Sequence, residues 1–422
     1  MQLTETKQES TRCDRNKSLR ILMMSHMPWS RDLGGPRILI ELAAQLQNHG
    51  CRVDKFDIDD AFPRKTKLTR LLGVALFHRR AIAHARNHGG QYDVIQAEQG
   101  NLPCSKKYLR FPGLLVAHSV GLAHFNERAR KADGSHGSTQ CLTRRLKNRV
   151  LCAAAERISG GLKAVNISFQ AADKIILLNK DECDFVRNTL GHGNKAVFFP
   201  GGLTEERAKA LVATAGSPKI RLSERLVVFI GRWDTLKGSR DFPALVRRIR
   251  QCLPATRFLL LGTGLSELAI LPQFDPSDRE NISIIPSFPS DELPSFLSRC
   301  TAGVFPSYTE GFGLAVLEKL ASGIPCVSYN IPGPREMLSE IVPDLMVSLG
   351  DVETLAKKVV AILQMPVSLY ANLSSRCITV AGKYRWEEIG QRAFELYRRG
   401  VAELRRSNEN EPNIPVPLES NP

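Results

Sequence analysis

The sequence predicts an α/β protein made of two doubly wound, Rossmann-like domains. A strand, a helix and another strand open the chain, and this order is typical of a parallel sheet with crossover helices. A second cycle of the same kind begins near residue 225, and 422 residues are enough for two such units. Two successive sheets fit this pattern better than one large sheet.

The first cycle starts with the apolar stretch "LRILMMSHMP" and continues with a helix over 34–50. In this helix Ile38, Leu42 and Leu46 fall at helical spacing, and Gly50 stands where a C-cap belongs. The strands expected after it are 51–58, 92–98, 113–119, 174–179 and 195–200.

The second cycle has strands at 225–233, 256–264, 281–287, 302–307 and 324–330, with helices at 239–251, 291–299 and 314–323. An amphipathic helix over 386–406 follows, and we expect it to pack back on the first domain. The predicted division is a disordered segment 1–18, domains 19–200 and 201–385, this helix, and a disordered tail 407–422.

Charge is distributed unevenly between the two predicted domains. Residues 1–200 hold 32 Lys and Arg against 18 Asp and Glu, whereas residues 201–422 hold 26 against 25. The halves are therefore expected to face different partners. The polar amino terminus has no apolar core of a signal peptide, so we expect a cytoplasmic protein.

The stretch "SYTEGFGLAVLEKLASGIPCV" places Glu310 before a predicted helix and Glu318 inside it, with Gly311 and Gly313 between them. Open α/β sheets bind ligands at the carboxyl ends of their strands, and backbone N–H groups at a helix start bind anions. Two carboxylates that bind hydroxyl groups on either side of a phosphate site suit a nucleotide sugar. As a glycosidase acid pair they fit poorly, because such carboxylates must flank one bond.

Two cations are expected to complete this site. In "GRWDTLKGSRDF", Arg232 follows a strand and Lys237 comes five residues later. Arg can bind a phosphate through two N–H groups and Lys adds a compact charge. Together they would neutralise a departing nucleoside diphosphate.

With these motifs the sequence resembles the retaining family-four glycosyltransferases, which have the GT-B fold. The resemblance implies that the two Rossmann-like domains face each other across a cleft. Glu310 and Glu318 match that family's E-x7-E motif, and Arg232 and Lys237 match its diphosphate clamp. "SHMPWSRDLGGPRILIELAAQL" is similar to its glycine loop, and "LLVAHS" to its histidine-bearing strand. The resemblance extends from about residue 19 to 400.

The resemblance implies a role for each matching residue. Glu310 and His118 would lie at the donor sugar, and Glu318 would bind the ribose. The phosphates would lie against the remaining residues of the donor site, which are Gly34, Gly35, Arg232, Lys237, Gly311, Phe312, Gly313 and Leu314. It also implies retention of anomeric configuration, no metal ion and no cofactor beyond the donor substrate. The base could lie between Ile285 and Phe288.

Residues 63–86, "PRKTKLTRLLGVALFHRRAIAHAR", form a basic amphipathic segment with two interpretations. It could lie on an anionic membrane at the cytoplasmic face, or pack in the core with a solvated basic face.

We therefore expect a hexosyltransferase that moves sugar from a nucleoside-diphosphate sugar to a saccharide or lipid-linked acceptor, in surface polysaccharide or lipopolysaccharide synthesis. A sugar-nucleotide epimerase or hydrolase on the same fold is the first alternative. A non-catalytic basic binding protein is the second alternative. No nucleic-acid-binding module accompanies the charge, and we expect no nucleic acid as a partner.

Overall fold

The computed structural model describes residues 18–133, 157–342 and 345–410, and it confirms the predicted α/β class with two parallel sheets. The first sheet has the strand order β2-β1-β3-β4-β5-β6. All of its pairings are parallel. Its strands are β1 (Arg20–Met24), β2 (Arg52–Phe56), β3 (Val94–Glu98), β4 (Leu114–His118), β5 (Lys174–Leu177) and β6 (Ala196–Phe198).

The second sheet has the order β12-β11-β10-β7-β8-β9 and is also parallel. The sequence did not predict its edge strand β12, which has two residues. Its strands are β7 (Leu226–Ile230), β8 (Arg257–Leu261), β9 (Ile282–Ile285), β10 (Ala302–Phe305), β11 (Cys326–Tyr329) and β12 (Met346–Val347).

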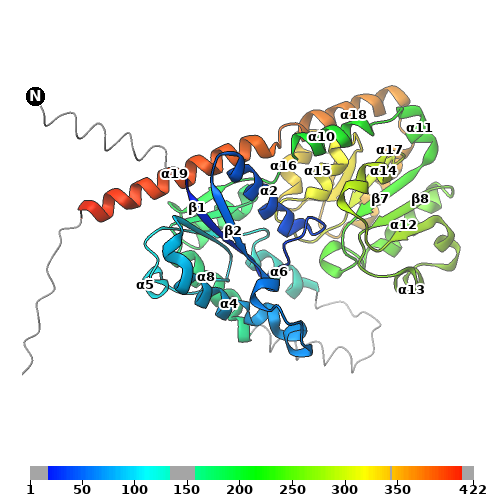
Figure 1. Ribbon diagram of the computed structural model, residues 1–422. Helices are drawn as coiled ribbons and strands as arrows, with labels where there is room; N and C mark the ends of the chain where they lie inside the picture. Colours follow the sequence, from blue (N-terminus) through cyan, green and yellow to red (C-terminus); the bar gives the residue numbers. More distant parts are fainter. Residues whose placement is uncertain (1–17, 134–156, 343–344, 411–422) are drawn as a thin grey trace, which may run out of the picture.

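Helices cover both sheets, and each sheet with its helices forms one of the two lobes of the molecule (Figure 1). The first lobe contains α2 (Gly34–Asn48), α3 (Ile58–Ala61), α4 (Lys67–His88), α5 (Lys106–Leu109), α6 (Ala123–Asp133), α8 (Gly161–Ala171) and α9 (Lys180–Asp184). Between the last strand of the first sheet and the first strand of the second lie α10 (Glu205–Ala213) and α11 (Pro218–Glu224). The second lobe continues with α12 (Phe242–Cys252), α13 (Glu267–Ile270), α14 (Leu293–Leu297), α15 (Leu314–Ala321), α16 (Pro334–Ser339), α17 (Val352–Leu363) and α18 (Val367–Ala381).

The alternation of side chains along β1 shows how the first sheet is covered. Ile21 and Met23 pack in one cluster with residues of α2 and α19 (Trp386–Asn410), whereas Leu22 and Met24 pack in another with residues of α4. The inner strands β1 and β4 are mostly apolar because both faces of the sheet are buried, whereas the edge strand β2 carries charged residues.

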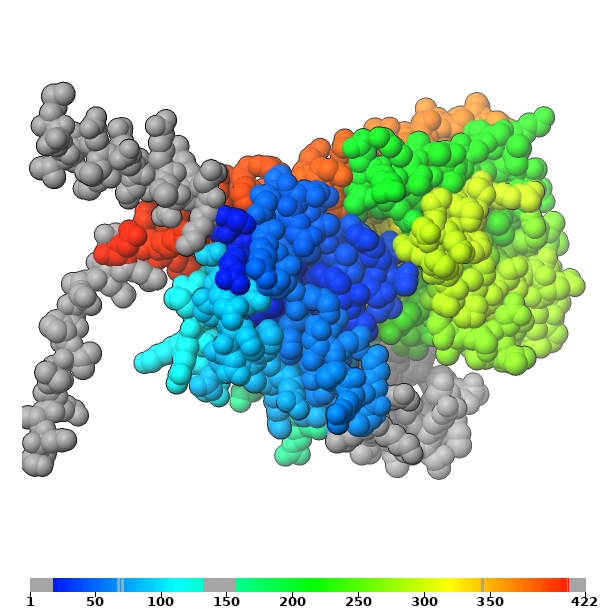
Figure 2. Space-filling model, viewed as in Figure 1, coloured from blue at the N-terminus to red at the C-terminus, as the bar shows by residue number. Residues whose placement is uncertain are grey.

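The last helix, α19, crosses back from the second lobe to the first. It contacts α2 and β4, and Arg405 donates a hydrogen bond to Asp93 at 2.8 Å. Figure 2 shows this red helix on the side of the blue and cyan residues. The helix runs to Asn410, beyond the predicted end at 406. The expected terminal segments lie almost entirely outside the described residues.

Helix α4 has a buried side and an exposed basic side. Phe77, Ala81 and Ala85 are buried, while Arg79 and Arg80 are exposed. The helix therefore packs in the core, as the second interpretation of residues 63–86 requires. In the described part of the chain, no helix is long and apolar enough to cross a bilayer.

Candidate active site between the two lobes

The glycine turn between β10 and α15 lies in close contact with the first lobe. A Cβ atom on Gly311 would lie 2.2 Å from the carbonyl oxygen of Val120, in the loop after β4. Asn179, after β5, donates to the carbonyl oxygen of Gly311 at 2.5 Å. Gly313 has φ of 94°, a left-handed conformation that favours glycine, and it is the N-cap of α15. The glycines thus serve both the contact between lobes and the start of the helix.

The other residues expected around the phosphates lie at two helix starts. Leu314 is the first residue of α15, and Phe312 is buried against Tyr384. Gly34 and Gly35 open α2 on the first lobe.

Of the two expected cations, the structure brings Lys237 to the turn. Its ammonium group forms an ion pair with the Glu310 carboxylate and lies 5.8 Å from the centre of the Phe305 ring. Arg232 has a side chain that is 78% exposed, and it pairs with Asp234 at 3.1 Å. Lys237 and Glu310 therefore meet at the turn, whereas the Arg232 side chain is mostly exposed and pairs with Asp234.

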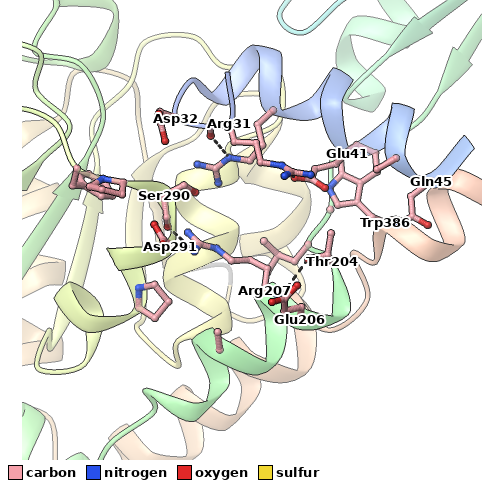
Figure 3. Close-up of a pocket in the computed structure, with 18 of the residues that line it drawn as sticks. Arg31, Asp32, Glu41, Gln45, Thr204, Glu206, Arg207, Ser290, Asp291 and Trp386 are labelled. Atoms are coloured by element: carbon pink, nitrogen blue, oxygen red, sulfur yellow. Dashed lines mark hydrogen bonds and ion pairs between the residues drawn. The ribbon is translucent and has the colours of Figure 1, made fainter. Parts of the chain in front are cut away.

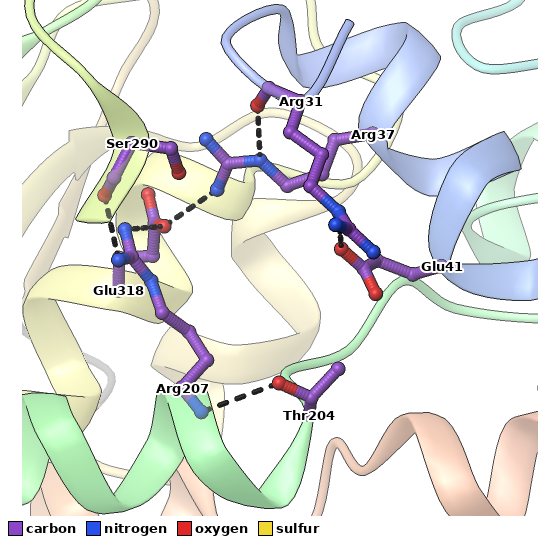
Figure 4. Close-up of polar contacts among 7 residues, drawn as sticks. All are labelled: Arg31, Arg37, Glu41, Thr204, Arg207, Ser290 and Glu318. Atoms are coloured by element: carbon purple, nitrogen blue, oxygen red, sulfur yellow. Dashed lines mark hydrogen bonds and ion pairs between the residues drawn. The ribbon is translucent and has the colours of Figure 1, made fainter. Parts of the chain in front are cut away.

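Glu318 is held by two arginines that the sequence interpretation missed (Figure 4). Arg37, on α2, donates to its Oε1 from the first lobe at 2.7 Å, and Arg207, on α10, donates to the same oxygen at 2.8 Å. Burial alone would raise the pKa of Glu318, but the two guanidinium groups reverse this effect and lower it. Because both bind Oε1, a ribose hydroxyl would have to bind Oε2.

A cavity of about 920 Å³ opens beside this cluster (Figure 3). Its walls come from α2, from the start of α10 and from residues 287–291, so both lobes contribute. Phe288 and Ser290 line it together with Arg37 and Arg207. Its volume lies in the range of pockets that hold small ligands.

His118 ends β4 and is 1% exposed. Burial lowers its pKa to about 4, so the imidazole is neutral. Tyr397 donates to Oε1 of Gln96, and Nε2 of Gln96 lies 2.8 Å from Nδ1 of His118. Nδ1 is therefore an acceptor, and the imidazole proton is on Nε2. Within the described residues Nε2 has no partner, so it presents a free N–H donor.

Sequence reasoning missed a further carboxyl group, Glu182 on α9. Its Oε1 accepts from the N–H of Leu122 at 2.9 Å, while Oε2 has no partner among the described residues. Burial raises its pKa to about 8, and the nearby carboxylates of Glu310 and Asp181 add to this shift. Arg37 is the one missed residue with a sequence signal, because it directly follows the glycine loop.

Comparison with solved structures defines the class of this architecture as GT-B. Sucrose-phosphate synthase from Thermosynechococcus elongatus superposes with a TM-score of 0.71 at 20% identity, over 91% of this chain and all of that one. The Anabaena protein Alr3699/HepE, solved in complex with UDP-glucose, superposes with a TM-score of 0.60 at 17% identity, over 92% of this chain and all of that one. At these identities the likeness concerns the fold.

Sequence comparison points to glycosyltransferases as well. Residues 224–365, which contain all four motif residues of the second lobe, match the family described as Glycosyl transferases group 1. A D-inositol 3-phosphate glycosyltransferase from Mycobacteroides abscessus is 26% identical over 279 residues, 62% of this chain and 59% of that protein. These matches confirm the resemblance at the level of the family. The chain spans about half the length of the curated relatives it matches.

Proposed function

We propose that the protein is a retaining glycosyltransferase that uses a nucleoside-diphosphate sugar. The observation that carries this proposal is the ion pair between Lys237 and Glu310 at the turn before α15. On the same helix, Glu318 binds Arg37 and Arg207, which line a cavity between the two lobes. When a donor binds, its pyrophosphate would take over the Lys237 ammonium group and the N–H groups of the turn. Glu310 would then be free to accept hydrogen bonds from sugar hydroxyls.

The nucleoside would occupy the neighbouring cavity. The ribose would bind Oε2 of Glu318, and the base would lie against Phe288. His118 would donate its free Nε2–H to a hydroxyl of the donor sugar. Because Alr3699/HepE was solved with UDP-glucose, a uracil nucleotide is the first donor to test.

The reaction proposed is transfer of the sugar to a saccharide or lipid-linked acceptor for surface polysaccharide or lipopolysaccharide. The donor's anomeric carbon breaks its bond to phosphate oxygen and forms one to the acceptor oxygen, on the same face. The leaving phosphate takes the acceptor proton, and no metal is required. Trapping a glycosyl ester on Glu310 by mass spectrometry would contradict this route.

The test combines ligand binding with two variants. A thermal-shift panel of nucleotide sugars should reveal a ligand, since a ligand at a concentration of 100 times its Kd stabilises the folded state by about 2.7 kcal/mol. Lys237→Ala and Glu310→Ala should abolish transfer while folding is preserved, and Lys219→Ala, an exposed lysine on α11, is the control. Near-normal turnover in either site variant would contradict the assignment. Donor turnover that is independent of every acceptor would favour the epimerase or hydrolase.

We also propose that the basic side of α4 contacts anionic lipid. Arg79 and Arg80 are exposed, and Val74 is 61% exposed on the same helix. Each cation near an anionic surface contributes about 1 kcal/mol. Sedimentation with phosphatidylglycerol vesicles should fall sharply in the double variant Arg79→Glu, Arg80→Glu. Equal sedimentation of the variant and the parent protein would exclude this surface.

A further inference from the structure

A second polar cluster lies at the carboxyl end of the first sheet, beside His118. Glu98 is the last residue of β3, and it is the register partner of His118 on β4. Register partners on parallel strands point to the same face and are about 4.8 Å apart. Glu98 is 4% exposed, and Ser25, just after β1, donates to its Oε2 at 3.2 Å.

His26 completes the cluster with a defined tautomer. Its Nδ1 lies 3.2 Å from Oε2 of Glu98 and 3.3 Å from Oδ1 of Asn101. Both of these oxygens accept hydrogen bonds, so Nδ1 must carry a proton. In the neutral form of this ring the lone pair is then on Nε2. The side chain is 29% exposed, so a ligand can approach the ring from solvent.

Asn101 provides the second, independent observation. It is 5% exposed, and among the described residues its Nδ2 has no hydrogen-bond partner. A buried donor without a partner is unfavourable, so a ligand with an acceptor oxygen is expected there. The cluster thus offers one free acceptor, on His26, and one free donor, on Asn101.

We infer that Ser25, His26, Glu98 and Asn101 form the binding site for an uncharged polyol or sugar, the acceptor end that receives the transferred group. A hydroxyl can donate to Nε2 of His26 while a neighbouring hydroxyl oxygen accepts from Nδ2 of Asn101. The carboxylate of Glu98 disfavours a phosphate at this point. The inference rests on the proposed function, because it takes the donor sugar to lie at His118, one strand away.

The tautomers of the two histidines support this division of the ligands. Gln96 donates to His118 and leaves that ring with a free N–H, whereas Glu98 accepts from His26 and leaves that ring with a free lone pair. His118 at the end of β4 therefore offers a hydrogen-bond donor to the donor sugar. His26, after β1 and on the other side of β3, offers a hydrogen-bond acceptor to the attacking hydroxyl.

The test follows sugar binding directly, with and without UDP. Full-length protein labelled with ¹⁵N-histidine is titrated with methyl α-glucoside, methyl α-mannoside and myo-inositol. At least one probe should shift the His26 imidazole signals, which are assigned with His26→Gln. Its affinity should fall at least tenfold in His26→Ala and about threefold to tenfold in Asn101→Ala. UDP affinity should change less than twofold in both variants.

His88→Ala is the matched control, because His88 is an exposed histidine of the same lobe, at the end of α4. If no probe moves the His26 signals, or if His26→Ala binds the sugar as tightly as the parent protein, the inference is wrong. A parent protein that binds the sugar at His26 but no nucleotide sugar would contradict the proposed function instead. The two failures are therefore distinguishable.

Discussion

Arg37→Ala tests whether the bond between Arg37 and Glu318 holds the two lobes together. This bond is 2.7 Å long, and its side chains are 18% and 4% exposed. A hydrogen bond to a charged group contributes about 1.5–3 kcal/mol. Each 1.4 kcal/mol changes an equilibrium constant tenfold, so loss of this hydrogen bond should raise the equilibrium constant for opening of the lobes roughly 12-fold to 140-fold.

The backbone amide of Lys180 forms one of the hydrogen bonds between the lobes, and it serves as the reporter of this opening. It donates across the lobes to Oε1 of Glu336 at 2.6 Å, so it exchanges with solvent hydrogen when the lobes separate. We expect its exchange in Arg37→Ala to be faster by the factor given above, measured by NMR on protein without ligand.

Arg207→Ala is the matched control, since it removes a bond of similar length to the same oxygen of Glu318 but leaves the bond from Arg37. It should change the exchange of Lys180 less than threefold. If Lys180 exchanges in Arg37→Ala as slowly as in the parent protein, Arg37 does not hold the lobes together and the reasoning fails.

Three further predictions concern the residues around the site. Tyr397→Phe leaves the buried Oε1 of Gln96 without a donor, and denaturant unfolding should show a loss of about 1–3 kcal/mol; an unchanged midpoint would contradict the hydrogen bond. Gly311→Ala places a Cβ atom 2.2 Å from the oxygen of Val120, so lobe contacts should weaken by about 1–3 kcal/mol, read from the same amide exchange. Glu182 has a native pKa near 8 against an ordinary value of 4.5, so the native state holds the proton that the unfolded state has lost. As the pH rises from 4.5 to 8, the free energy of unfolding should therefore fall by at most about 1.4 kcal/mol per pH unit because of this group. The Glu182→Gln variant should lack this fall when unfolding is measured against pH. Equal slopes in the variant and the parent protein would show that the carboxyl group ionises normally.

The sequence alone determined the two parallel sheets and the place of the candidate site. Apolar strands such as β1 and β4 are short and regular, and the periodicity of α2 is local information that sequence carries. The spacing of Glu310 and Glu318 around two glycines is likewise local, because one turn and one helix contain the whole motif.

The tertiary structure decided which distant side chains meet these residues. Arg37 and Glu318 are 281 positions apart, and Tyr397 and Gln96 are 301 apart, so no local pattern predicts either contact. The register of β3 against β4 brings Glu98 beside His118, and the return of α19 fixes the proton on that histidine. Tautomers and ion pairs depend on such long-range packing, and for this reason the chemistry of the site became readable only once the chain was folded.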